Sequence, residues 1–246
     1  MKRLVLALVT AMAACGPAWA APPDCAVSAD LIRHDQDLPR LRAALAARRS
    51  LAVVVVGSGS SLGKGLPDPA QAWTALLAGD LAAALPGSRP VVTNLAAPGT
   101  TAPMALAGAI IRAEARRPHL VVWEVGNTDA VQEVPLGEFA DAVTEGIHRM
   151  EGAGSEVILV NMQYSPETAA LIDFDPYRAA IDQIARTESV DLFDRWAIMR
   201  QYVDSGRFDP SADRGGGQAV FVNACLARLL AGMIADAVNP AAVTGR

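Results

Sequence analysis

The run Val53-Val54-Val55-Val56-Gly57-Ser58-Gly59-Ser60-Ser61-Leu62-Gly63 is the strongest structural signal in this chain. Four consecutive β-branched apolar residues are typical of a strand buried on both faces, as in a parallel sheet covered by helices. The small residues that follow predict a tight turn at the carboxyl end of that strand. In open α/β sheets this edge carries the functional residues, and such a turn is one way to present a nucleophilic serine.

Apolar strands and helical segments alternate along the rest of the chain. Because continuous apolar strands joined by short connections are typical of parallel sheets, we predict an α/β fold with a doubly wound sheet. No repeat, linker or change of composition interrupts the pattern, so we expect one domain over residues 21–246. Asp68 and Pro69 suit the N-cap and the first position of one helix. Strands are predicted at 51–56, 91–95, 119–125, 156–161 and 190–193, and helices at 38–49, 69–85, 103–117, 136–150, 176–187, 195–203 and 219–238.

The first 20 residues resemble a signal peptide. Met1-Lys2-Arg3 is a basic start, the apolar run 4–14 is too short to span a bilayer, and Ala18-Trp19-Ala20 fits signal-peptidase cleavage. We therefore expect an exported protein, periplasmic or secreted, that begins at Ala21. Cleavage before Cys15, as in a lipoprotein, is a poorer match, because an aliphatic residue is usual three positions before that cysteine. We expect no later apolar run to be long enough to cross a membrane.

Charge and composition exclude some classes of function. The chain is 52% hydrophobic and 19% charged, which is enough apolar sequence to bury a sizeable core. Removal of Lys2 and Arg3 with the signal peptide changes the formal net charge from −5 to −7. An acidic chain whose paired arginines lie at predicted helix ends is not expected to bind nucleic acid. No metal-ligand spacing, dinucleotide motif or P-loop is present in the sequence, so no cofactor and no metal are expected.

Cleavage after Ala20 leaves two cysteines, Cys25 and Cys225. An even pair in an oxidising compartment favours a disulfide bond between the N-terminal arm and the last helix. The alternative is two unrelated buried thiols.

Several blocks of this sequence resemble the SGNH (GDSL-type) hydrolases, which are exported esterases, lipases and carbohydrate deacetylases. The resemblance covers the whole mature chain, and it implies a three-layer, flavodoxin-like domain with a five-stranded parallel sheet. In that family a serine in the first block attacks an ester carbonyl, and a histidine near the C-terminus, oriented by an acid three residues earlier, accepts its proton. Backbone N–H groups and an asparagine of the third block stabilise the oxyanion. The similar blocks are 94–99, 118–126, 163–166 and 192–199.

Three of the family's functional positions are changed in this chain. Alignment of the first block on residues 57–63 places Gly59 where the nucleophile belongs. The third block has Thr128 in place of the asparagine, and Asn127 stands one position too early. Counting forward from Asp213 puts Gly216 at the histidine position, and counting back from Cys225, which matches a cysteine of the family, puts Gly217 there. The oxyanion glycine of the second block is retained as Gly99.

These departures favour a non-catalytic protein that keeps its cleft as a binding site. An acylated glycan or lipid of the cell envelope is the ligand class that the resemblance implies. Gly59 and Gly217 would widen the cleft floor, and Ser58, Ser60, Asn127 and Thr128 would offer hydrogen bonds.

Two alternatives remain open on the sequence. The first is an active ester hydrolase in which Ser58 or Ser60 is a displaced nucleophile, with Asp213 or a recruited His34 as its base. His34 lies nine residues after Cys25, so a disulfide to Cys225 would give it the reach. The second is a structural partner protein that binds no small ligand.

Overall fold

The computed structural model describes residues 24–47, 50–213 and 215–239. The expected signal peptide and Cys15 lie outside these ranges. Strands and helices alternate along the described chain as predicted. In chain order the elements are η1 (Ala29–Ile32), α1 (Pro39–Ala46), β1 (Ser50–Val56), η2 (Gly59–Leu62), η3 (Pro69–Gln71), α2 (Trp73–Ala84), β2 (Arg89–Asn94), α3 (Ala102–Ala105), the π-helical η4 (Leu106–Ile110), α4 (Ile111–Arg116), β3 (Leu120–Glu124), α5 (Asn127–Val131), α6 (Leu136–Gly152), β4 (Glu156–Val160), α7 (Pro166–Ala169), α8 (Asp175–Thr187), β5 (Asp191–Phe193), α9 (Arg195–Asp204) and α10 (Gly217–Val238).

The sheet has five parallel strands in the order β2-β1-β3-β4-β5, which confirms the predicted α/β fold. β1 pairs with β2 on one side and with β3 on the other, so that Val53 lies between Val92 and Leu120. Because every strand runs in the same direction, the loops after β1, β2, β3 and β4 meet at one edge of the sheet.

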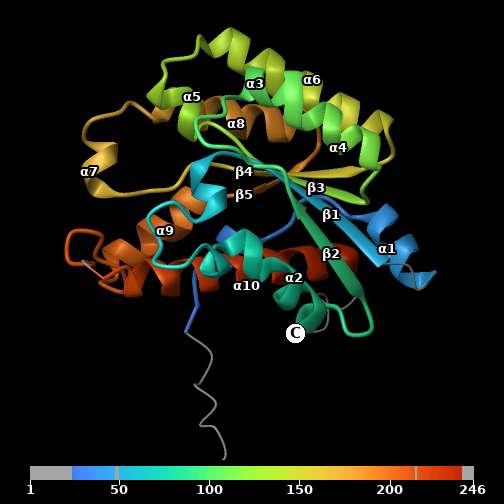
Figure 1. Ribbon diagram of the computed structural model, residues 1–246, viewed down its shortest axis with the longest axis horizontal. Helices are drawn as coiled ribbons and strands as arrows, with labels where there is room; N and C mark the ends of the chain where they lie inside the picture. The colour runs from blue at the N-terminus through green and yellow to red at the C-terminus, as the bar shows by residue number, and fades with distance from the viewer. Residues whose placement is uncertain (1–23, 48–49, 214, 240–246) are drawn as a thin grey trace, which may run out of the picture.

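Helices cover both faces of the sheet in three layers (Figure 1). The strand residues alternate between the two faces, as the two-residue period of a strand requires. Val53 and Val55 contact the layer that contains α1, α2, α9 and α10, whereas Val54 and Val56 contact α3, α4, α6 and α8. All four valines are at most 2% exposed. Burial on both faces explains why this strand is apolar at every position.

α10 corrects one expectation from the sequence. With 22 residues and a mean hydropathy of 1.6 over its most apolar segment, it is long and apolar enough to cross a membrane by length and composition. The expectation that no run after the signal peptide reaches that length was therefore wrong. In the fold this helix packs against α2, and Leu230 and Ile234 are fully buried in the core. Such a core helix passes the same test as a membrane span.

The second predicted helix is divided into two pieces. Asp68 accepts a hydrogen bond from the backbone N–H of Ala70 at 2.8 Å, so its predicted capping role is confirmed. The turn η3 ends after Gln71, and α2 begins afresh at Trp73. There the side chain of Asn223 on α10 accepts the N–H of Trp73 at 3.0 Å. A cap supplied by a distant helix thus sets the start of α2.

A disulfide bond joins Cys25 to Cys225, the pairing that the sequence favoured. The two Cα atoms are 5.1 Å apart, and both cysteines are buried. The Tyr202 hydroxyl donates to the carbonyl oxygen of Cys25 at 3.0 Å, and burial raises the pKa of Tyr202 to about 12. The N-terminal arm is therefore tied both to α10 and to α9.

We expect Cys25→Ala/Cys225→Ala to fold with a lower melting temperature. The bond closes a loop with a sequence separation of 200, and on the chain-entropy model a loop of this length contributes about 5 kcal/mol to the free energy of unfolding. Urea titration monitored by circular dichroism measures the loss. Reduction of the wild-type disulfide should reproduce it, and unfolding curves that coincide with and without the bond would contradict the prediction.

Candidate functional site

The loop after β1 packs tightly against the end of β3. A Cβ atom added at Gly57 would come 2.5 Å from Ser61 Oγ and 2.9 Å from Glu124 Oε2, so this position requires glycine. The chain then forms the turn η2 and leaves it at Gly63, whose φ of 73° lies in the left-handed region. The small residues of this loop are therefore explained by close packing at the carboxyl edge of the sheet.

A buried carboxylate organises this edge. Glu124, the last residue of β3, accepts hydrogen bonds from Ser58 N at 3.0 Å, from Ser58 Oγ at 3.1 Å and from Ser61 Oγ at 2.8 Å. Arg195 Nη2 lies 3.4 Å from Glu124 Oε1, and the side chains of this ion pair are 2% and 1% exposed. We refer to Ser58, Ser61, Glu124 and Arg195 as the Glu124 cluster.

Arg195 connects this cluster to the other strands. It begins α9 and donates from Nε to the carbonyl oxygen of Asn161, directly after β4, at 3.1 Å. Its Nη1 donates to Ser60 Oγ at 3.3 Å. Burial lowers the pKa of Arg195, and the charge of Glu124 opposes that shift. The guanidinium thus links the loop after β1 to the ends of β3 and β4.

The cluster determines what the two candidate serines can do. Ser58 is 4% exposed and its hydroxyl donates to Glu124, so it is not presented to an incoming substrate. Ser60 is partly exposed, but its oxygen accepts a hydrogen bond from Arg195. A guanidinium cannot act as the general base that a serine nucleophile needs, because it stays protonated.

Glycine stands at the expected nucleophile position, 59, and at both candidate base positions, 216 and 217. A Cβ atom at Gly59 would lie 3.3 Å from Lys64 Cδ, a flexible side chain. A Cβ atom at Gly217 would meet no heavy atom within 4 Å. Neither glycine has a positive φ angle. A Cβ atom is therefore accommodated at 59 and 217. At Gly216, the other candidate base position, φ is 71° and a Cβ atom would come 2.7 Å from Pro67 Cδ, so that position requires glycine.

Asp213 and Gly99 have other partners in the structure. The Asp213 carboxylate accepts the N–H groups of Gln218 at 3.1 Å and Ala219 at 2.7 Å, so it caps the first turn of α10. Gly99 is exposed with a φ of 71°, and its carbonyl oxygen accepts from the Gln132 side chain at 3.3 Å. Asp213 therefore acts as a helix cap in this arrangement.

The third block contains a carboxylate that the sequence analysis did not single out. Asp129 accepts the N–H of Ala102 at 2.6 Å and the N–H of Gly126 at 3.1 Å. Burial raises its pKa, and these two N–H groups oppose the shift. Asn127 begins α5 partly exposed, whereas Thr128 is buried in the same turn. An acid three residues after Gly126 is a helix N-terminus signal that could have identified Asp129.

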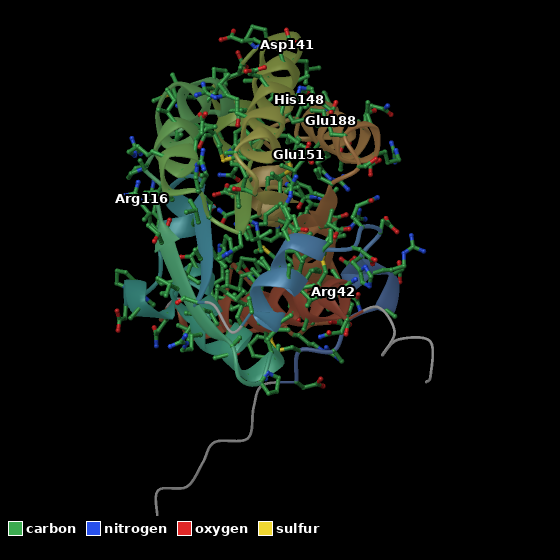
Figure 2. The ribbon with its side chains drawn as sticks, turned by 90° about the vertical axis from the view of Figure 1, so that its right-hand side faces the viewer. Arg42, Arg116, Asp141, His148, Glu151 and Glu188 are labelled. Carbon is green, nitrogen blue, oxygen red and sulfur yellow. A yellow bond between two sulfur atoms is a disulfide. The ribbon has the colours of Figure 1, made fainter. Side chains whose placement is uncertain are left out.

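The histidines lie at the opposite edge of the sheet. The N–H groups that follow His34 are bound by Asp191, the first residue of β5, which holds this arm at the amino ends of the strands. His119 immediately precedes β3, and His148 on α6 contacts Glu188 at 2.6 Å (Figure 2). The suggestion that His34 is recruited as a base was therefore wrong. Within the described ranges no group of three or more His, Cys, Asp or Glu side chains is arranged to hold a metal ion.

A pocket of about 180 Å³ opens beside Ser60. It lies between the loop after β1, the start of α9 and the first half of α10. Trp73, Met199, Phe208, Val222 and Leu226 give it apolar walls, and Ser60, Lys64, Gln163 and Arg195 give it polar ones.

We expect Arg195→Met to lower the free energy of unfolding by about 3–5 kcal/mol, because it leaves the Glu124 carboxylate buried without its cation. Glu124→Gln/Arg195→Met should lose less than Arg195→Met alone, since no charge then stays buried. Urea titration measures both. Arg186→Met, which removes an exposed ion pair with Asp182, is the control and should change stability by less than about 1 kcal/mol. Additive losses in the double variant would contradict the prediction.

Solved structures with a similar fold include an acetylxylan esterase and a lipolytic protein. TesA is 22% identical, with 76% of this chain and 98% of that chain covered and a TM-score of 0.58. A lipolytic protein of the G-D-S-L family from Desulfitobacterium hafniense is 18% identical, with coverage of 74% and 100% and a TM-score of 0.55. The acetylxylan esterase Axe2 from Geobacillus stearothermophilus is 18% identical, with coverage of 73% and 94% and a TM-score of 0.56. At these identities the likeness shows the fold alone.

No curated protein matches the sequence of this chain. The sequence model of the non-GDSL lipase-like family matches residues 24–240, which include every strand and helix described above. The chain belongs to the non-GDSL lipase-like family, and its fold is shared with the solved structures named above.

Proposed function

We propose that this chain is a non-catalytic member of its family, an exported protein whose cleft binds an acylated glycan or lipid of the cell envelope. One observation carries the proposal. Of the two candidate base positions, Gly216 requires glycine because its φ is 71°, whereas Gly217, like Gly59 at the nucleophile position, stands where a Cβ atom is accommodated. The surrounding backbone does not require glycine at 59 or 217. The consequence of these two glycines is therefore the absence of a serine and a histidine side chain.

The remaining groups at this edge support the same conclusion. The Ser58 hydroxyl is held by Glu124, and the Ser60 oxygen accepts from Arg195. All three histidines of the chain lie toward the amino ends of the strands. The acyl-enzyme route needs a serine nucleophile and a base that activates it, so a chain without these groups loses that route.

The ligand class and the location rest on different grounds. The solved structures with this fold include a lipolytic protein and an acetylxylan esterase, which act on acyl esters. We propose that this chain binds an acyl group as its ligand and does not hydrolyse it. The Cys25–Cys225 disulfide is typical of oxidising compartments, which supports export.

We expect a fluorophosphonate probe to leave the purified mature protein unlabelled. The probe reports an activated and accessible serine. Ser58 is 4% exposed and its hydroxyl is held by the buried Glu124–Arg195 ion pair, and the Ser60 oxygen accepts a hydrogen bond from Arg195. Intact mass spectrometry measures the adduct, and the mass of the disulfide-bonded protein confirms that the sample is native. An adduct mapped to Ser58 or Ser60 would contradict the proposal and support an active ester hydrolase.

We expect Gly59→Ser/Gly217→His to gain fluorophosphonate labelling at residue 59. Both side chains fit, and together they restore a hydroxyl and a base to the same edge. Gly217→His alone is the matched control and should stay unlabelled. If the folded double variant does not react, these two positions do not account for the loss of chemistry.

A further inference from the structure

An exposed apolar groove runs between the segment α3–α4 and α6, on the layer opposite the pocket beside Ser60 (Figure 1). Its volume is about 750 Å³, and Pro103, Leu106, Ala107 and Ile111 form its apolar wall. A concentration of exposed apolar side chains on one face is typical of a protein–protein contact. Of the six large apolar side chains that are exposed in the described part of the chain, four lie on the elements around this groove, namely Met104, Ile111, Val131 and Leu136.

Acids line one end of this groove. Glu138, Asp141 and Glu145 belong to α6, and their spacing of three and four residues places them on one side of that helix. All three are exposed, and none forms an ion pair with another described residue. Asp141 and Glu145 are like charges one helical turn apart, and like charges at this spacing destabilise a helix. A cation supplied from outside would relieve this repulsion.

Arginines occupy the other end. α4 and α6 run side by side in the same direction, because each leads from the carboxyl edge of the parallel sheet back to its amino edge, and the ion pair between Glu114 and Arg149 fixes their register. Arg112 and Arg116 therefore lie toward the amino edge, whereas the three acids lie toward the carboxyl edge. Figure 2 shows Arg116 well apart from Asp141. Both arginines are exposed and form no ion pair within the described ranges.

We refer to this surface as the α4–α6 face, and it includes Ile111, Arg112, Arg116, Glu138, Asp141 and Glu145.

A face with an apolar middle, an acidic end and a basic end is complementary to itself. In a two-fold symmetric dimer both copies use the same patch, so each contact between the copies is made twice. A two-fold axis that crosses the groove would place the three acids of each copy against Arg112 and Arg116 of the other, with Ile111 between them. The charges also select this orientation, because other arrangements of the two copies would bring like charges together.

We infer that the α4–α6 face is the contact surface of a symmetric homodimer, in which the acids of each copy pair with the arginines of the other around an apolar centre. The inference goes beyond the proposed function and does not depend on it. The pocket beside Ser60 lies on the other layer, between the loop after β1, α9 and α10, so this dimer leaves the pocket open.

Sedimentation velocity of the mature, disulfide-bonded protein measures its mass over a series of concentrations, and we expect a reversible dimer. Two charge-reversal variants test the face. Glu138→Lys/Asp141→Lys/Glu145→Lys makes both ends basic, and Arg112→Glu/Arg116→Glu makes both ends acidic. Each should raise the dissociation constant of its own dimer by about tenfold or more, because like charges then meet. An equimolar mixture of the two variants should form a heterodimer, since opposite charges face each other again at both ends.

Matched variants control for net charge and for apolar area. Asp30→Lys/Glu167→Lys/Asp236→Lys changes the net charge by the same amount at exposed acids outside the face, and it should dimerise as the wild type does. Ile111→Asp should weaken the dimer about tenfold, since it buries a charge in the apolar centre. Leu171→Asp alters an exposed apolar side chain outside the face and should have no effect. Melting curves confirm that each variant is folded.

Three results would overturn the inference. The first is a wild-type protein that sediments as a monomer at every concentration. The second is a pair of charge-reversal variants that dimerise as the wild type does, which would place the contact elsewhere. The third is a mixture of the two variants that stays monomeric, which would exclude the pairing of acids with arginines. None of these results bears on fluorophosphonate labelling, which tests the proposed function separately.

Discussion

The buried ion pair between Glu124 and Arg195 is the interaction on which the carboxyl edge of this protein depends. Two charges taken out of water cost several kcal/mol each, and the penalty is offset only when their remaining hydrogen-bonding groups are also satisfied. Glu124 therefore accepts from the hydroxyls of Ser58 and Ser61, and Arg195 donates to Asn161 and Ser60, while its Nη2 makes only the ion-pair contact with Glu124. Three strand ends are fixed to one another by this requirement.

The same requirement bears on function. A hydroxyl that donates a hydrogen bond to a buried carboxylate is not available to attack an ester. If that hydroxyl turned away, Glu124 would have one hydrogen-bond donor fewer. The close packing of Gly57 against Ser61 and Glu124 restricts these hydroxyls further, because the loop cannot move away from β3 without opening the Glu124 cluster. The serine-rich sequence of the loop, which resembles a nucleophile turn, here serves to solvate an acid.

The two edges of the sheet have divided roles. At the amino edge, Glu156 accepts the N–H groups of Arg40 and Leu41 at the start of α1, and Asp191 binds the arm that follows Cys25. Burial raises the pKa of both carboxyls, and these N–H groups oppose the shift. Acids at that edge anchor the chain, and the histidines gather there. The carboxyl edge holds the Glu124 cluster and the pocket beside Ser60.

The sheet and most helices were predictable from the sequence, because apolar runs and helix-ending residues are local signals. The short helices α5 and α7 were not, since four or five residues show no period. An acid at the end of the apolar run Val121-Val122-Trp123-Glu124 was a visible anomaly, but its partner Arg195 lies far away in the sequence. The short chain between Cys25 and His34 suggested that His34 could approach the last helix. The hydrogen bonds from the residues after His34 to Asp191 hold this segment at the amino edge instead.

Gly59 and Gly217 differ in kind from the glycines that the fold requires. Gly57 and Gly63 are required by close contact and by a left-handed backbone, so their identity follows from the fold. At 59 and 217 the fold would accept a side chain, so the fold cannot explain why none is there. The chain keeps the Glu124 cluster, the Asp213 cap and the disulfide in place, although it has no serine at 59 and no histidine at 217. It therefore maintains a shaped cleft without these two groups. Retention of that shape is what a binding protein needs.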